Sequence, residues 1–352
     1  MRTLNNKTRS LCNVCYREIP AQVYEKDRRV LIQKSCPRHG TFTGLVEKDP
    51  TFYRWFSGIY PRKYRRFTTL LLPVTYRCDL DCRYCFSIHP GRPDMTFDEI
   101  TQAVKNFKGR SIELSGGEPT LRKDLPLIIK MANDSGKEVI LETNGLKLAD
   151  MQYLKRLKKA GLGQVLFSLD SLKIAFYNKI SAGKQHLRRN VLAIKSKALV
   201  NLEREGIPTI LSATIYRGLN DRELNDLFMF AARRNGFISQ IRFRGCVDIG
   251  SNRSDPHTSY TLSELFSLFA KQMHMDREDL KVHFLKSRLG RSLILDFKGP
   301  INGKRLEVKI VSWPTVENID LGDLKTSMAY LTHQKKLLKF FYGVIADRVS
   351  SE

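Results

Sequence analysis

Apolar and polar positions alternate in a regular order over residues 69–274. Short apolar runs predict strands, and each is followed by a segment whose apolar residues recur with the helical period. The predicted strands are Thr69–Tyr76, Ser111–Leu114, Lys137–Glu142, Gln164–Leu169, Thr209–Ile215 and Gln240–Arg244. The predicted helices lie near Asp98–Phe107, Leu125–Asn133, Met151–Ala160, Leu187–Glu205, Arg222–Arg234 and Leu262–His274. Such alternation predicts a parallel sheet with right-handed crossovers.

Local signals support this organisation. Three predicted helix starts carry the pattern of a capping box. In this motif the side chains of the N-cap and N3 residues accept hydrogen bonds from free backbone N–H groups of the first turn. The three pairs are Thr96 with Glu99, Asn220 with Glu223, and Thr261 with Glu264. Pro73 inside the first strand favours an edge strand, because proline cannot donate to a ladder. Six strand–helix units with an edge predict an α/β fold, a partial (β/α)6 TIM-like barrel over residues 68–275.

A small metal-binding module is predicted before the barrel, over residues 1–47. Cys12 and Cys15 form a C-x-x-C knuckle, and Cys36 with His39 forms a C-x-x-H knuckle. Two knuckles joined by a short hairpin, with a strand near Val30–Gln33, are typical of zinc ribbons. Too few apolar residues are present for a core of its own, so we expect the metal to hold it together. Cys246 competes with His39 as the fourth ligand, and mononuclear iron in a rubredoxin-like site competes with zinc.

Two further segments flank the barrel. Residues 48–67 interleave aromatic with basic residues, which we interpret as packing of the small module rather than as a membrane or nucleobase contact. Residues 276–352 are predicted to form an α+β extension. Its runs Ser292–Phe297 and Arg305–Ser312 predict a hairpin, and Tyr330–Arg348 predicts a basic helix that packs on the barrel or contacts a membrane surface.

Composition narrows the class of protein. Apolar residues make up 42% of the 352 residues, enough for a sizeable core. Sixty Lys and Arg against 36 Asp and Glu give a formal charge of +24, which attracts polyanions such as nucleic acid, anionic lipid or phosphorylated substrates.

Six of the seven cysteines fall in two tight groups and predict metal ligands rather than disulfides. Without a visible signal peptide or an 18-residue apolar run, we expect a cytoplasmic protein, at most peripheral on the inner membrane surface.

Three cysteines follow the first barrel strand at short intervals. Cys78, Cys82 and Cys85 lie too close along one loop for a disulfide framework, and three thiolates do not complete a structural zinc cage. A cubane iron–sulfur cluster takes four thiolates, so three would leave one iron open for chemistry. An ordinary zinc half-site or a loop of buried thiols is the alternative.

Polar and glycine residues also follow the next three strands. They are Gly116, Gly117, Glu118 and Pro119 after the second, Thr143 and Asn144 after the third, and Ser168 and Asp170 after the fourth. In folds of this kind the reactive groups gather at the carboxyl ends of the strands. Adjacent glycines permit close backbone approach, and a carboxylate can accept from an ammonium group. Each group alone is common turn chemistry, but their convergence predicts one site.

The C-x-x-x-C-x-x-C loop after the first strand, with Tyr84 before the last cysteine, resembles the signature of the radical S-adenosylmethionine (SAM) enzymes. The resemblance implies a [4Fe-4S] cluster on Cys78, Cys82 and Cys85, whose open iron chelates SAM. One electron then cleaves the sulfonium and gives a 5′-deoxyadenosyl radical that abstracts hydrogen from a C–H bond. It also implies an electron donor such as ferredoxin or flavodoxin.

The resemblance extends to the residues at the strand ends. S-G-G-E-P resembles the family's glycine-rich segment, which borders the methionyl amino group. Ser168, Asp170, Thr143 and Asn144 lie where the family contacts methionyl or ribose groups, and residues 213–220 resemble its segment near the adenosine. Independently of the family, an arginine at the end of the sixth strand, Arg244, can clamp an anionic group. Cys246 beside it is interpreted as a small buried residue.

With its N-terminal knuckles, the chain resembles the branch that includes archaeal tetraether-lipid synthases and pterin methyltransferases. It departs from that branch in lacking later cysteines for auxiliary clusters, which disfavours joining of lipid chains. We expect hydrogen abstraction from an anionic lipid, pterin or peptide. The alternatives are a radical SAM enzyme that modifies peptides or nucleic acid, and a zinc-ribbon nucleic-acid-binding protein without catalysis.

Overall fold

The computed structural model of the chain describes most of the predicted elements. The described residues are 2–15, 17–59, 69–82, 85, 93–180, 190–246, 259–286, 292–298 and 305–311. The predicted helix at 330–348 lies outside them. The chain divides into two compact units, one of residues 1–65, 244–295 and 310–352 and the other of residues 66–243 and 296–309. They are called unit 1 and unit 2 below.

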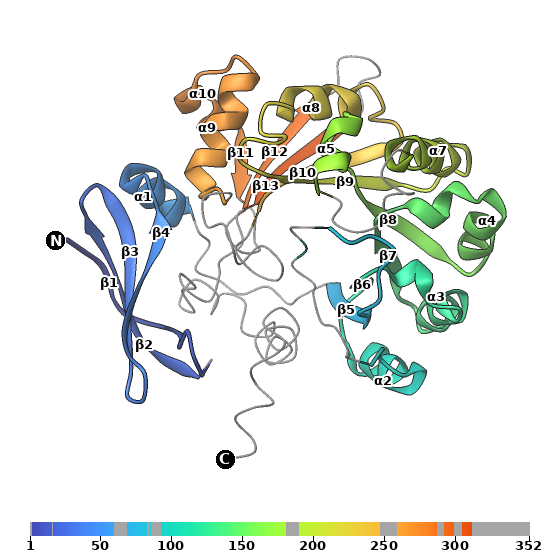
Figure 1. The fold of residues 1–352 in the computed structure, drawn as a ribbon, viewed down its shortest axis with the longest axis horizontal. Coiled ribbons are helices and arrows are strands. Elements are labelled where there is room, and N and C mark those ends of the chain that lie inside the picture. Colours follow the sequence, from blue (N-terminus) through green and yellow to red (C-terminus); the bar gives the residue numbers. More distant parts are fainter. Residues whose placement is uncertain are drawn as a thin grey trace. The chain divides into compact units, whose positions relative to one another are not determined.

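Unit 1 begins with a four-stranded antiparallel sheet in the order β1-β2-β3-β4 (Figure 1). Its strands are β1 (Arg2–Leu11), β2 (Glu18–Lys26), β3 (Arg29–Cys36) and β4 (Gly40–Glu47). Asp27 and Arg28 adopt positive φ angles of 51° and 56° in the turn between β2 and β3, the conformation that tight hairpins need.

The N-terminal module is larger and better packed than the sequence predicted. The expected strand at Val30–Gln33 lies within β3, but the expected short hairpin is one part of a full sheet. Ala21, Val23, Val30, Ile32 and Val46 form a buried cluster of their own. The expectation that this module lacks a core was therefore wrong. The strongly polar sequence of β1 concealed the extra strand, because alternation of apolar residues is weak there.

Three helices also belong to the described part of unit 1. They are α1 (Pro50–Ile59), α9 (Leu262–Gln272) and α10 (Arg277–His283), and β11 (Phe284–Lys286) follows them. Phe52 of α1 is 1% exposed, and its ring centroid lies 5.2 Å from that of Trp55 and 5.4 Å from that of Phe266. The interpretation of these aromatic residues as packing residues is confirmed for Phe52 and Phe56, which are both buried. Residues 60–67 of the same segment lie outside the described residues.

The larger sheet has the strand order β11-β12-β13-β10-β9-β8-β7-β6-β5. It contains β5 (Thr69–Thr75), β6 (Ser111–Gly116), β7 (Glu138–Thr143), β8 (Leu162–Ser168), β9 (Thr209–Ile215), β10 (Ile238–Gly245), β12 (Ser292–Lys298) and β13 (Arg305–Val311). The pairs from β5 to β9 are parallel. The predicted six-strand order is therefore confirmed, and β5, which carries Pro73, lies at the edge.

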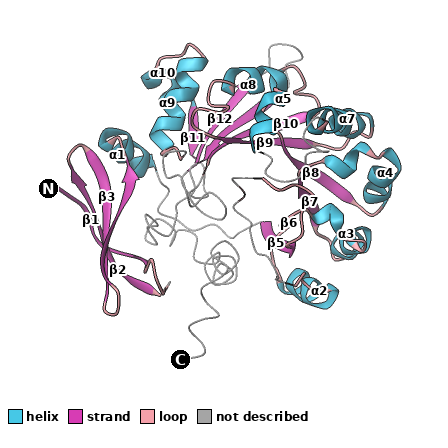
Figure 2. Cartoon of the chain, viewed as in Figure 1, coloured by secondary structure: helices cyan, strands magenta, loops and turns pink. Residues whose placement is uncertain are grey.

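Helices of unit 2 cover the outer side of this curved sheet (Figure 2). They are α2 (Phe97–Asn106), α3 (Leu125–Asp134), α4 (Met151–Lys159), α5 (Ile174–Ile180), α7 (Val191–Arg204) and α8 (Leu224–Ala232), with short 3₁₀ turns η1 (Pro119–Leu121) and η2 (Leu146–Ala149). Alternate strand residues such as Leu72, Leu114, Leu141, Val165 and Phe167 are at most 4% exposed. This α/β layer is the partial barrel that the pattern predicted.

Two of the three predicted capping boxes are present. Thr96 with Glu99 caps α2, and Thr261 with Glu264 caps α9. The third prediction was wrong, because α8 begins only at Leu224 and has no side-chain cap. Asn220 instead accepts a hydrogen bond from the backbone N–H of Tyr216. Among the described residues, no helix is long and apolar enough to cross a bilayer.

Candidate active site and N-terminal metal site

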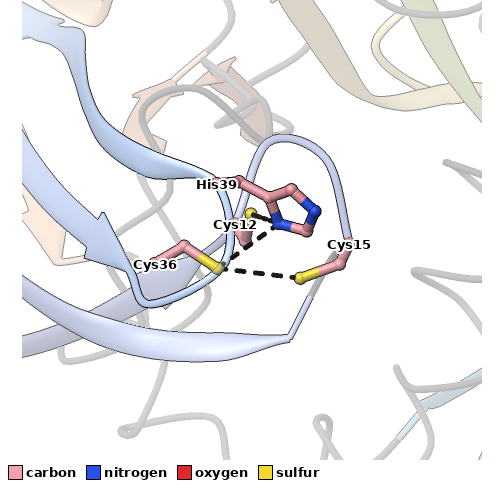
Figure 3. Close-up of side chains that lie close together, drawn as sticks. All are labelled: Cys12, Cys15, Cys36 and His39. Atoms are coloured by element: carbon pink, nitrogen blue, oxygen red, sulfur yellow. Dashed lines mark hydrogen bonds between the residues drawn. The ribbon is translucent and has the colours of Figure 1, made fainter.

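The two N-terminal knuckles meet at one end of the small sheet. Cys12 follows β1, Cys36 ends β3, and the turn after Cys36 brings in His39 just before β4. The ligand atoms of Cys12, Cys15, Cys36 and His39 lie within 4.8 Å of one another (Figure 3). The fourth residue of the predicted set is therefore His39, which the structure places beside the three thiols.

Distances within this group fit a tetrahedral ion. The Cys15 and Cys36 sulfurs are 3.9 Å apart, and the Nδ1 atom of His39 lies 3.5 Å from the Cys12 sulfur and 3.4 Å from the Cys36 sulfur. Two zinc–sulfur bonds of about 2.3 Å at a tetrahedral angle place the sulfurs about 3.8 Å apart. Three thiols and one imidazole at these separations suit zinc or iron equally.

Local hydrogen bonds prepare the thiols for a cation. The backbone N–H of Val14 donates to the Cys12 sulfur over 3.4 Å. Burial raises the pKa of the Cys36 thiol, but hydrogen bonds from the backbone of Arg38 and from the His39 ring outweigh it and lower the pKa to about 6. Burial raises the pKa of Cys15. One thiolate is thus favoured near neutral pH before an ion binds.

In unit 2, hydrogen bonds fix both ends of the segment that carries Cys78, Cys82 and Cys85. The hydroxyl of Thr75, the last residue of β5, donates to the Asp94 carboxylate over 2.6 Å, and Arg77 donates to the same carboxylate through Nε and Nη2. These bonds and the charge of Arg77, opposed by burial, lower the pKa of Asp94. The backbone N–H of Met95 also donates to the carbonyl of Val74. The segment therefore leaves and returns at the end of β5.

The three thiols of this segment are close enough for their charges to interact. Burial, with the charges of Glu118, Asp79 and Cys85, raises the pKa of Cys78 to about 12. Burial, with the charges of Cys85 and Cys78, also raises the pKa of Cys82. The backbone N–H of Leu80 donates to the Cys78 sulfur over 3.4 Å, as Val14 does to Cys12. None of the seven cysteines, all of them described, forms a disulfide.

The adjacent glycines after β6 lie directly against this segment. A Cβ atom on Gly116 would come within 2.1 Å of the Thr75 carbonyl oxygen, and one on Gly117 within 2.3 Å of the Arg77 carbonyl oxygen. The N–H of Gly117 donates to the Thr75 carbonyl over 2.8 Å. The two glycines therefore make the expected close backbone approach, and the backbone that they approach is that of Thr75 and Arg77, just before Cys78.

Glu118 is a buried hub between β6 and β7. Its carboxylate accepts from the hydroxyls of Thr120 and Thr143 over 2.6 and 2.7 Å, and from the backbone N–H groups of Thr120 and Asn144 over 3.1 and 2.7 Å. Burial raises the pKa of this carboxyl, and these donors oppose the rise. The prediction that Glu118 accepts from an ammonium group stays a prediction, since protein donors already approach both of its oxygens.

Asn144 connects this hub to the cysteine segment. Its side-chain Nδ2 donates to the Asp79 carboxylate over 2.7 Å and lies 3.9 Å from the Cys78 sulfur. Its Oδ1 accepts from the N–H of Leu146. Gly145, with φ of 84°, lets the chain turn here beside the Phe167 ring, where a Cβ atom would come within 2.1 Å of it. Asn144 therefore lies beside the first cysteine, whereas the Thr143 hydroxyl bonds to Glu118. Contact of either residue with a cofactor stays a prediction.

Asp170 fastens the end of β8 to that of β9. Its carboxylate accepts from the N–H of Thr214 over 2.7 Å, and its carbonyl accepts from Asn220 over 2.7 Å. The carbonyl of Ser168, the last residue of β8, accepts from the ammonium of Lys195 over 2.7 Å. The charges of Asp170 and Lys195 both act on Cys82, so these groups belong to the same region.

Lys195 was not among the residues predicted from the sequence. This residue of α7 is 2% exposed, and its ammonium also donates to the carbonyl of Asn144 over 2.7 Å. A lysine on an amphipathic helix gave no signal of its own. The one available hint was its position among the residues that form the buried face of the predicted helix at Leu187–Glu205.

The remaining predicted residues lie in unit 1. Arg244 is half-buried near the end of β10, and Cys246 follows the strand with 3% exposure. The burial of Cys246 agrees with its interpretation as a small buried residue. The role of Arg244 toward an anionic group stays a prediction.

Comparison with known proteins identifies the family to which the chain belongs. Residues 72–231 match the radical SAM superfamily, and residues 4–48 match the HMPTM N-terminal zinc ribbon domain. The 7,8-dihydro-6-hydroxymethylpterin dimethyltransferase of Methanocaldococcus jannaschii is 33% identical over 276 residues, which are 68% of this chain and 53% of that protein. A GTP 3′,8-cyclase of Campylobacter curvus is 32% identical over 231 residues, 62% of this chain and 67% of that protein.

Among solved structures, native anSMEcpe with bound AdoMet and Cp18Cys peptide is similar with a TM-score of 0.47 and 20% identity over 58% of each chain. The chain spans about half the length of several curated relatives that it matches. It belongs to the radical SAM superfamily, with a zinc ribbon domain of the HMPTM type before the barrel. The superfamily implies a [4Fe-4S] cluster and SAM.

Proposed function

We propose that Cys78, Cys82 and Cys85 hold a [4Fe-4S] cluster at the carboxyl end of β5, and that the enzyme abstracts hydrogen from a C–H bond of an anionic substrate. The observation that carries this proposal is the network at the strand ends. Asn144 reaches both Asp79 and Cys78 and is itself held by the buried Glu118. This network supports a position of the cysteine segment beside the strand ends, where the family resemblance puts SAM.

The donor set fits the cluster. Three neighbouring thiols on one short segment supply three irons with ligands and leave the fourth without a protein sulfur. Thiolates are the ligands, so loading must release the protons that burial retains on Cys78. When bound, the cluster and SAM supply reductive cleavage of the sulfonium and the hydrogen abstraction that follows it.

This chain's own residues would bind and orient the cofactor. We propose that the backbone of Gly116 and Gly117 and the side chains of Ser168 and Asp170 contact SAM. Because the Glu118 carboxylate accepts from the Thr143 hydroxyl and from the N–H of Asn144, we assign these three residues the task of orienting the surface that contacts SAM. The same geometry keeps Asp79 turned toward Asn144.

The substrate class follows from the relatives rather than from the site. A relative named for a dihydropterin covers 68% of this chain, so we place a pterin before a lipid or a peptide. The formal charge of +24 supports an anionic substrate and an acidic electron donor of the ferredoxin or flavodoxin kind. Contact with an anionic membrane surface or with nucleic acid stays a prediction of lower rank. We assign the N-terminal site to structural zinc.

The test is anaerobic incubation of the iron-reconstituted protein with SAM and dithionite, assayed for 5′-deoxyadenosine and methionine. We expect turnover to increase when 7,8-dihydro-6-hydroxymethylpterin is added, compared with lipid extracts and peptide pools. Cys82→Ala should abolish both the cluster absorbance and the 5′-deoxyadenosine. The matched control is Cys246→Ala, which removes a buried thiol outside the loop and should leave the iron content unchanged.

Two results would contradict the proposal. A reconstituted protein that holds only the N-terminal metal and no cluster would favour the zinc-ribbon binder, which a DNA and RNA binding assay at several salt concentrations then checks. A cluster that forms but yields no 5′-deoxyadenosine with excess reductant would remove the assigned chemistry. Cleavage of SAM without any effect of the pterin would overturn the substrate alone.

A further inference from the structure

Lys195 is a buried cation that the proposed chemistry has not used. Its ammonium bridges the ends of two neighbouring strands, donating to the carbonyls of Asn144 after β7 and Ser168 at the end of β8, each over 2.7 Å. Lys195 itself lies in α7, so one side chain fastens the helix layer to both strand ends. The Asn144 that it holds is also the residue that reaches Cys78 and Asp79.

The surroundings of this ammonium favour a positive charge. It lies 5.4 Å from the centre of the Phe167 ring and 5.8 Å from that of the Tyr177 ring, where ring faces attract cations. Burial lowers the pKa of Lys195, and the negative charges of Asp170, Cys82, Glu118 and Asp79 oppose that shift. The carbonyls, rings and acids together offset part of the cost of removing the charge from water.

A purely structural role does not require a charged residue here. A methionine would fill the same space between Phe167 and Tyr177 without desolvating an ion, and a glutamine could still donate to a carbonyl. The feature that only a cation supplies is positive potential in a region that collects negative groups. Those groups are Glu118, Asp79 and Asp170, joined by three thiolates once iron is bound.

We propose that Lys195 is a positioning residue of the iron–sulfur site, which would supply positive potential that favours the reduced cluster and which ties the ends of β7 and β8 together. This inference rests on the proposed function, because it needs a cluster on Cys78, Cys82 and Cys85. One added electron makes the cluster more negative, so a fixed cation whose charge acts on Cys82 stabilises the reduced state relative to the oxidised state.

The experiment compares the reconstituted full-length protein with four variants. Lys195→Met removes the charge and the donor, Lys195→Gln keeps a donor without the charge, and Lys195→Arg keeps both. Lys197→Met, on the exposed side of the same helix, is the matched control. Each protein is titrated anaerobically with dithionite, and the reduced cluster is quantified by electron paramagnetic resonance. Thermal unfolding of each apo protein is measured alongside.

We expect Lys195→Met and Lys195→Gln to disfavour one-electron reduction of the cluster about tenfold, a potential about 59 mV more negative. Lys195→Arg should restore the wild-type potential, and Lys197→Met should not change it. Lys195→Met should also lower the unfolding midpoint of the apo protein more than Lys195→Gln does. A change in stability without a change in potential would overturn the electrostatic assignment.

The remaining outcomes also support or overturn the role assigned to Lys195. If neither neutral variant holds a cluster while Lys195→Arg does, the need for charge is supported; if Lys195→Arg fails equally, it is overturned. Wild-type potential in Lys195→Met with an intact cluster overturns this inference while the proposed function stands. A wild-type protein that takes up no cluster removes the proposed function itself, so the two failures are distinguishable.

Discussion

Buried charges at the strand ends are the main feature of unit 2 at the scale of single residues. Glu118 collects four protein donors. Arg122, which is 6% exposed, donates to the carbonyls of Val74 and Met95 and pairs with Asp124. Each such group bonds to backbone atoms of segments that are distant in sequence. These groups hold the loops by specific hydrogen bonds, which fix the position of each loop more strictly than apolar packing would.

Replacing Glu118 with glutamine should destabilise unit 2 by about 1–3 kcal/mol. The new amide nitrogen must face the backbone N–H of either Asn144 or Thr120, so a buried donor loses its acceptor. Chemical denaturation of the apo protein measures the loss. Glu138→Gln is the control, because that side chain is 55% exposed. Equal stability of Glu118→Gln and wild type would show that the hub contributes little.

Replacing Gly117 with alanine should displace the cysteine segment. The new Cβ atom would lie 2.3 Å from the Arg77 carbonyl oxygen, and backbone must move to relieve the clash at a cost of about 1–3 kcal/mol. We expect at least a twofold loss of iron bound per chain after reconstitution. Gly163→Ala is the control, since its nearest backbone neighbour is 3.3 Å away. Full iron occupancy in Gly117→Ala would contradict this account.

How much of the site was predictable depends on how each residue acts. Cys12, Cys15, Cys36 and His39 were predicted because ligand spacing is a local property of the sequence. Long-range contacts are not local: the bond from Lys195 to Ser168 spans 27 residues and that to Asn144 spans 51. Glu118 was identified as a site residue, but only the fold revealed that its carboxylate faces the threonines.

At the scale of elements, the parallel strands were predictable and the N-terminal sheet was not. Strands β5 to β10 read as apolar runs because buried parallel strands are apolar on both faces. The sequence of β1, RTLNNKTRSL, has neither an apolar run nor clear alternation. Its pairing with β2 shifts register twice, and such irregular pairing leaves no period in the sequence. Helix α1 was likewise not predicted, because its aromatic residues were interpreted as packing residues without regard to their helical spacing.

The start of α1 provides a pH-dependent prediction. Asp49 accepts from the N–H of Phe52 over 2.9 Å and pairs with Arg277 over 2.5 Å. Burial raises the pKa of Asp49, but these two partners outweigh it and lower the pKa below its ordinary value of 3.8. Because the folded pKa is depressed, the stabilisation is complete above the ordinary value and is lost as pH falls through the folded pKa.

Asp49→Asn should therefore lower the free energy of unfolding by about 1 kcal/mol at pH 7, since asparagine still caps the helix but lacks the charge. The difference from wild type should shrink as the pH falls below about 4. Urea denaturation at pH 7 and pH 3.5 measures it, with Asp27→Asn in the exposed β2–β3 turn as the control. A difference that is constant with pH would contradict the assignment.

At the scale of the whole molecule, each unit has its own core and its own candidate metal centre. The N-terminal site lies in unit 1, and the cysteine segment after β5 lies in unit 2. Proteins with separate cores commonly depart from two-state unfolding. Metal binding at the N-terminal site and cofactor binding in unit 2 should therefore shift different unfolding transitions.

We predict two transitions in calorimetry of the anaerobically loaded protein. SAM at about 100 times its dissociation constant adds about 2.7 kcal/mol to the unit that binds it, which should raise one midpoint by roughly 5–10 °C. Cys36→Ser should lower the other midpoint by more than about 5 °C, because the metal links β1 to β3. Ser35→Ala is the neighbouring control. A single transition that responds to both changes would contradict this independence.

The pairing of Thr75 and Arg77 with Asp94 has a consequence for assembly. These bonds close the loop around the three cysteines with protein atoms alone, so the entropy of loop closure is already lost when the chain folds. Iron should then enter an existing framework, and uptake by the folded apo protein should follow one concentration-dependent phase without a slow conformational step. In Asp94→Ala the framework opens, and the same uptake should acquire a lag that no excess of iron removes.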